Sequence, residues 1–315
     1  MRVFLKIVLA AGLLLGLVRC DWGPTPVDEQ SLVVEAFLDT GAPPPPVILR
    51  RTAPLQQGEA HLQDAAPGGQ VVVTLGGTEI PYEEAGGQPG RYQPTRNTVV
   101  PPQAAWSLRA EWNGETARAS GRTPMAISID EVCIDVPAQP AEAIQVDSLR
   151  RDSLDIPADQ GYIYPIDVAV RWHARPVPQE IDSSTWVRAQ LRPDASAFSS
   201  EVVEFFLEPA EIQQELRYPQ ADGARQWKGV YAVPVDSSTA PLPRHLLTTS
   251  VTRGDTAFAS FAQTRTDPDR REPISNVEGG LGVALAVSVD SLSRSVADTL
   301  ARDDRRRCWE PDQAP

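Results

Sequence analysis

Histidines are scarce in this chain, and none of them stands at a spacing typical of a catalytic or metal-binding motif. There are three, His61, His173 and His245, and the sequence contains no HExxH, GxSxG or CxxC pattern. His173 falls on the outward face of an expected strand, where a solvated side chain explains it. We therefore predict a protein that is not an enzyme, with no catalytic residue and no cofactor.

One group of carboxylates deserves comparison with a cation site. Asp267, Asp269 and Glu272 place three oxygen ligands in one loop, as a hard cation such as Ca²⁺ requires. Their spacing differs from that of an EF-hand loop, so a solvated charged loop is the favoured interpretation. We expect no metal site elsewhere in the chain.

The first of three cysteines closes an export signal. Arg2 and Lys6 precede an uncharged run of about a dozen residues, and Cys20 follows it; a membrane-spanning helix needs about 20 apolar residues. The ending of residues 17–20 resembles a bacterial lipobox, although Arg19 occupies the place of the usual small residue. We expect residues 1–20 to be a lipoprotein signal peptide and Cys20 to carry the lipid. An uncleaved signal anchor and ordinary secretion are the alternatives.

The other two cysteines form an even pair in a chain that we expect to be exported. Oxidising compartments favour disulfides, so we predict a bond between Cys133 and Cys308. The alternative is two buried free thiols.

The overall charge limits the partners. The 315 residues carry a net charge of −13, and only Lys6 and Lys228 are lysines. Nucleic acid binding requires a basic face, so we expect no nucleic acid partner.

The length predicts two domains after the signal, and no other apolar run is long enough to span a membrane.

The first half of the chain reads as short strands separated by turns. After a tether at residues 21–30, residues 105–112 alternate between apolar and polar side chains, and Asn113-Gly114 is a strong hairpin signal. About six such strands predict an immunoglobulin-like or transthyretin-like β-sandwich over residues 31–123.

The second half, residues 124–315, is expected to be a second β-sandwich-like, β-rich domain with one or two short helices. Asp255 could cap a helix over residues 256–264, and the competing interpretation of that segment is a hairpin strand. A buried strand is expected at residues 281–289. The spacing of Val289, Leu292, Val296 and Leu300 then predicts a second helix. The fold class is therefore mainly β.

Several segments resemble a known family. The sequence AFASF, followed by the loop DPDRREPISNVEGGLGV, is similar to the C-terminal part of the domain-of-unknown-function family 4249, lipoproteins of Bacteroidetes-type bacteria. LVVEAFLDTG, VVVTLGG and PGRYQP are similar to its first domain. We name the residues Ser275, Asn276, Gly279, Gly280 and Gly282 the signature loop.

The resemblance implies a place and a partner, and it assigns no catalytic residues. Members of the family are typically encoded beside TonB-dependent receptors, so we expect a lipid-anchored protein of the cell envelope, at the outer membrane, that serves nutrient uptake with such a receptor. The alternative is a surface adhesion or glycan-binding module, because seven tryptophans could stack on sugars. Trp106 and Trp172 lie in alternating strands, however, and are expected to be core residues.

Overall fold

A computed structural model describes residues 31–52, 64–142, 162–173, 186–194, 212–214, 224–265, 274–297 and 306–311. This part of the chain is mainly β, as predicted, with a single helix, α4 (Thr256–Arg265). Its strands are β1 (Leu32–Asp39), β2 (Val47–Arg51), β3 (Asp64–Ala65), β4 (Gln70–Leu75), β5 (Thr78–Glu84), β6 (Arg91–Pro94), β7 (Ala105–Trp112), β8 (Glu115–Arg122), β9 (Ile129–Asp135), β10 (Ala141–Glu142), β11 (Tyr162–His173), β12 (Trp186–Asp194), β13 (Gln213–Gln214), β14 (Ala224–Val235), β15 (His245–Gly254), β16 (Leu281–Val296) and β17 (Arg306–Trp309).

The first core lies inside a strongly curved sheet. Its strands run in the order β16-β1-β2-β6-β5-β4-β7-β8. In β7 every second side chain, beginning with Trp106, is buried, because alternate residues of a strand point to one face. The β7–β8 hairpin turns at Asn113 and Gly114, whose φ angles of 49° and 85° suit the predicted tight turn.

The second core lies between two sheets. One is the five-stranded sheet of β10, β11, β9, β17 and β14, and the other is the continuation of the large sheet through β16, β15, β12 and β13. Trp172 and Tyr231 are fully buried on the inner face of the smaller sheet. Val251 and Leu247 of β15 pack against them from the larger sheet.

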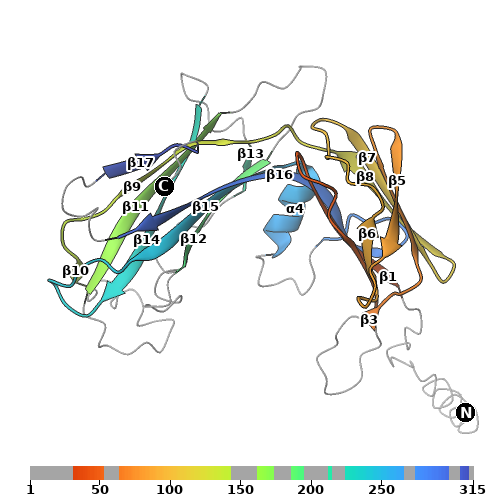
Figure 1. Cartoon of the computed structure of the whole chain (residues 1–315), viewed down its shortest axis with the longest axis horizontal. Helices are drawn as coiled ribbons and strands as arrows, with labels where there is room; N and C mark the ends of the chain where they lie inside the picture. The colour runs from red at the N-terminus through yellow and green to blue at the C-terminus, as the bar shows by residue number, and fades with distance from the viewer. Residues whose placement is uncertain are drawn as a thin grey trace, which may run out of the picture.

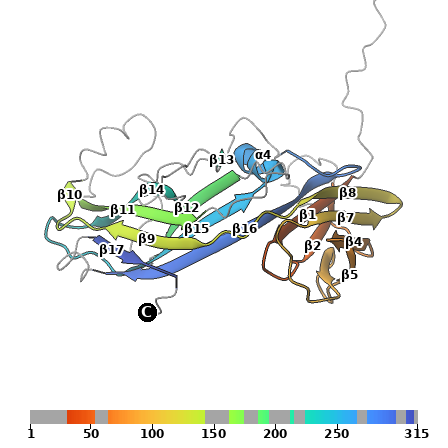
Figure 2. The same ribbon diagram turned by 90° about the horizontal axis from the view of Figure 1, so that it is seen from above.

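A single long strand, β16, joins the two bodies (Figure 1 and Figure 2). Its first part pairs with β1 in parallel, from Leu281 to Val287, and its second part pairs with β15, from Val287 to Val296. The prediction of a helix that begins at Val289 is therefore wrong. Leu292 and Val296 lie four residues apart, a spacing that places residues on one face of a helix and also on one face of a strand.

Helix α4 covers one face of β16, and this explains the uninterrupted apolar run there. Val283, Leu285 and Val287 pack with Phe258 of the helix, whereas Ala284 and Ala286 face the first core. The predicted helix is confirmed, and the hairpin strand is excluded. The Asp255 carboxylate accepts a hydrogen bond from the Phe258 amide at 3.1 Å, as an N-cap does.

The domain boundary predicted between residues 123 and 124 stays a prediction. Three residues from the expected second domain, Val277, Ala284 and Ala286, also pack in the first core.

Among the described residues no helix is long and apolar enough to cross a bilayer. Residues 1–30, with Cys20 and the tether, lie outside the described residues. So do His61 and the acidic loop of Asp267, Asp269 and Glu272.

Candidate functional site

The signature loop runs against the first residues of β16. The Asn276 side-chain amide donates to the Ala284 carbonyl at 2.5 Å and accepts from the Ala284 amide at 2.9 Å. The Asn276 amide donates to the Gly282 carbonyl at 3.3 Å. The side chain of Asn276 thus forms the hydrogen bonds to the backbone of β16 that a neighbouring strand would otherwise form.

Two glycines of the loop allow the backbone to approach other strands closely. A Cβ atom at Gly282, where φ is +108°, would lie 2.1 Å from the Val34 carbonyl oxygen. At Gly279, where φ is +73°, it would lie 2.3 Å from the Thr116 carbonyl oxygen. Only glycine combines this backbone conformation with such contacts. Gly280 packs closely as well, beside the Leu32 carbonyl.

The loop therefore closes the first body. Arg118 of β8 and Glu278 exchange two backbone hydrogen bonds of 2.8 Å, so the loop pairs with the last strand of the curved sheet. Ser275 accepts a hydrogen bond from the Val277 amide at 3.4 Å. These contacts give the signature residues an architectural role.

A disulfide on the outer face of the smaller sheet joins Cys133 and Cys308, as predicted, and the alternative of two free thiols is excluded. The two cysteines are directly opposite each other in the pairing of β9 with β17, and their Cα atoms are 4.0 Å apart. The bond closes a segment of 175 residues. It holds the end of the chain on the first strand of the second body.

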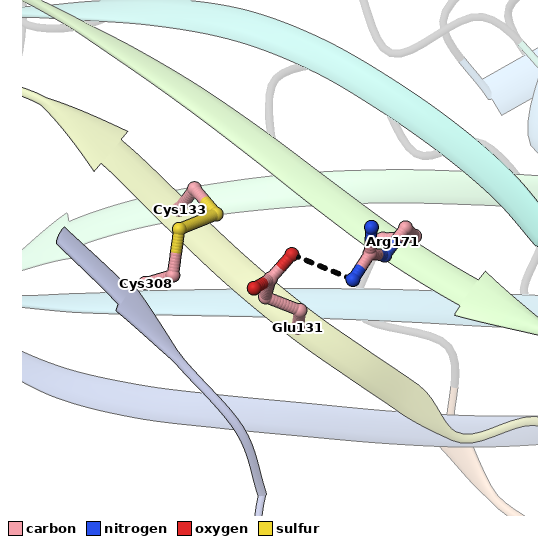
Figure 3. Close-up of a disulfide and its surroundings, with 4 residues drawn as sticks. All are labelled: Glu131, Cys133, Arg171 and Cys308. Atoms are coloured by element: carbon pink, nitrogen blue, oxygen red, sulfur yellow. Dashed lines mark ion pairs between the residues drawn. A yellow bond between two sulfur atoms is a disulfide. The ribbon is translucent and has the colours of Figure 1, made fainter. Parts of the chain in front are cut away.

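Glu131 lies beside this disulfide and points toward Arg171, as Figure 3 shows. Its carboxylate forms an ion pair of 2.9 Å with the Arg171 guanidinium. The Glu131 oxygen and the two sulfurs lie within 4.8 Å of one another, a set that could hold a metal ion. With the sulfurs bonded to each other, however, no thiolate remains to act as a ligand.

A hollow of about 440 Å³ opens next to the disulfide, over β14, β11 and β9. Its base includes Cys133 and the small side chain of Ala169, which pair across β9 and β11. Four charged residues line it. They are Asp135, Asp167, Lys228 and Arg306. We take this hollow as a candidate binding site.

The sequence did not single out these four residues. Each stands at an outward position of a strand, where a charged side chain is ordinary. Lys228 carried the one available signal, because it is one of only two lysines in the chain. These four residues come together only because strands that are far apart in sequence pair with one another, and no local sequence pattern reveals this pairing.

The two histidines that the structure describes have different surroundings. His173 is exposed, as expected, and its Nδ1 contacts the Asp130 carboxylate. His245 is buried, with its Nδ1 2.8 Å from the Pro243 carbonyl and its Nε2 2.6 Å from the Tyr231 hydroxyl. A carbonyl only accepts, so Nδ1 carries the hydrogen and Nε2 accepts from Tyr231. Burial lowers the pKa of His245, and the hydrogen bond to Pro243 partly opposes this.

Most aromatic rings of the described residues lie inside the two bodies. Trp106 and Trp172 are core residues, as predicted. No tryptophan or tyrosine among the described residues is exposed.

No curated protein matches this chain. The model of the family described as "Domain of unknown function (DUF4249)" matches residues 23–190, more than half of the chain. The matched segment ends before the signature loop. The chain therefore belongs to the DUF4249 family.

Proposed function

We propose that this protein is a non-enzymatic lipoprotein of the cell envelope, held at the outer membrane by lipid on Cys20, and that it is an accessory component of a TonB-dependent transporter. The observation that carries the location outside the cytoplasm is the disulfide between Cys133 and Cys308, since such bonds persist in oxidising compartments. The transporter partner rests on what the family resemblance implies. The signal-like residues 1–20 agree with that location.

The architecture supports a binding or docking role. Because β16 runs through both bodies, the two cores share one hydrogen-bonded framework. Within the first body, the signature loop adds a further backbone pairing, between Glu278 and Arg118 of β8. A stiff scaffold of this kind suits a protein that presents a surface to a partner. The glycan-binding alternative requires an exposed row of aromatic rings, and no observation on the described residues favours it.

The lipid anchor can be tested by labelling cells with radioactive palmitate. The wild-type protein is expected to be labelled and to sediment with membranes, because several acyl chains at about 0.8 kcal/mol per buried CH₂ hold a domain on a bilayer. Cys20→Ser is expected to lose the label and to be released. Label that persists on Cys20→Ser rejects the anchor. Affinity isolation from solubilised envelopes tests the partner, and the absence of a TonB-dependent receptor from the isolate rejects the association.

A further inference from the structure

The hollow beside the disulfide is lined by side chains of both charges that form no ion pair with any other described residue. The pairing of the strands places Asp135 of β9 directly opposite Asp167 of β11. It also places Arg306 of β17 opposite Asp135. Within the described part of the chain, no ion pair within 4.0 Å involves Asp135, Asp167, Lys228 or Arg306.

The two carboxylates make the centre of the hollow favourable for a positive group. Like charges that face each other across neighbouring strands repel, and a bound ammonium group between them relieves the repulsion. An ammonium group also has three donors, enough to serve both carboxylates.

The two cations lie on the flanking strands. Lys228 of β14 is opposite Ala169 of β11, and Arg306 lies on β17, beyond β9. The two backbones are therefore about 14 Å apart, three strand spacings, and both long side chains can reach inward. The small side chain of Ala169 leaves the space between them open. A volume of about 440 Å³ lies within the range of small-molecule sites.

We propose that this hollow binds a small zwitterion, a free amino acid or a dipeptide. Its ammonium group lies between Asp135 and Asp167, and its carboxylate is held by Lys228 and Arg306. The inference rests on the proposed function, because it gives the accessory protein a ligand to deliver.

Lys228 provides the readout. The lipidated protein from which residues 1–19 have been removed is labelled with ¹³C at the lysine side chains and held in a non-ionic detergent. It gives a signal from Lys228 alone, because Lys6 is the only other lysine of the sequence, and the loss of this signal in Lys228→Arg confirms the assignment. The probes are an equimolar mixture of the protein amino acids and an equimolar mixture of their dipeptides. We expect at least one mixture to shift the Lys228 signal in a saturable way.

N-acetylated probes and aspartate variants distinguish binding of a zwitterion in this hollow from non-specific attraction of an anion to Lys228. N-acetylation of the mixtures, which removes the ammonium group, is expected to weaken binding at least tenfold. Asp135→Asn and Asp167→Asn are expected to do the same, whereas the exposed Glu83→Gln of β5 leaves binding unchanged. If neither mixture shifts the Lys228 signal, the proposal is overturned. A shift that survives acetylation or the aspartate substitutions overturns it as well.

This experiment uses the purified protein without a transporter. A negative result therefore rejects the ligand and leaves the association with a receptor standing. Failure to isolate a receptor rejects the association and leaves the binding of the zwitterion standing.

Discussion

Asn276 binds the backbone of Ala284 through both atoms of its side-chain amide. The contact fixes the signature loop at the point where β16 enters the first body. Ala284 itself is fully buried, so its amide and carbonyl have no water to replace a lost partner.

Asn276→Ala is expected to destabilise the protein by about 2 to 3 kcal/mol, since it leaves a buried donor and a buried acceptor unsatisfied. Urea denaturation measures the change in the free energy of unfolding. The exposed Asn97→Ala serves as the control and is expected to change it little. Equal stability of the two variants would contradict the structural role of Asn276.

Gly282→Ala is expected to cost about 3 kcal/mol or more, because a side chain there is both strained and in contact with the Val34 carbonyl. Gly86→Ala is a matched control, since nothing lies within 4 Å of a Cβ atom at that position. Thermal unfolding of the two variants gives the comparison. A Gly282→Ala protein as stable as Gly86→Ala would show that the close approach to β1 is absent.

Removal of the disulfide is expected to destabilise the protein by about 2 to 5 kcal/mol, since the bond restricts a long loop in the unfolded chain. The double variant Cys133→Ala/Cys308→Ala is compared with the wild type, each with and without a reductant. Reduction should lower the stability of the wild type and leave the variant unaffected. If the reductant changes the stability of the wild type and of the double variant equally, the disulfide does not stabilise the folded protein.

The stability is also expected to fall as the pH drops below about 6.5, where an unfolded histidine takes up a proton. The pKa of His245 is lowered in the folded protein, so the unfolded state binds more protons in this window. Burial raises the pKa of Tyr231, which keeps its hydroxyl protonated to donate to His245. Denaturation between about pH 7.5 and 5.5 should show a smaller slope for His245→Gln. An unchanged slope would assign the effect to other groups.

The local patterns in the sequence were sufficient for much of the fold. Alternation predicted β7, the Asn-Gly pair predicted its hairpin, and Asp255 with the apolar stripe predicted α4. The error at Val289 arose because a spacing of four residues suits a helix and a strand equally, and the choice depends on β15, which pairs with β16 from a distant part of the sequence.

The candidate site could be predicted only in part. An even pair of cysteines was enough to predict the disulfide. The hollow was not foreseen, because Asp135, Asp167 and Lys228 meet through long-range strand pairing. The architectural role of Gly282 was missed for the same reason, since the contact that requires a glycine lies on β1.

The proposed association with a transporter can be tested by reciprocal affinity isolation. The tagged wild-type protein is isolated from solubilised envelopes of its host, and each candidate receptor found is tagged in turn. We expect a TonB-dependent receptor to be enriched with the wild type, to recover the protein in the reciprocal isolation, and to be depleted with Cys20→Ser, which lacks the anchor. Isolates with no such receptor in either direction would contradict it.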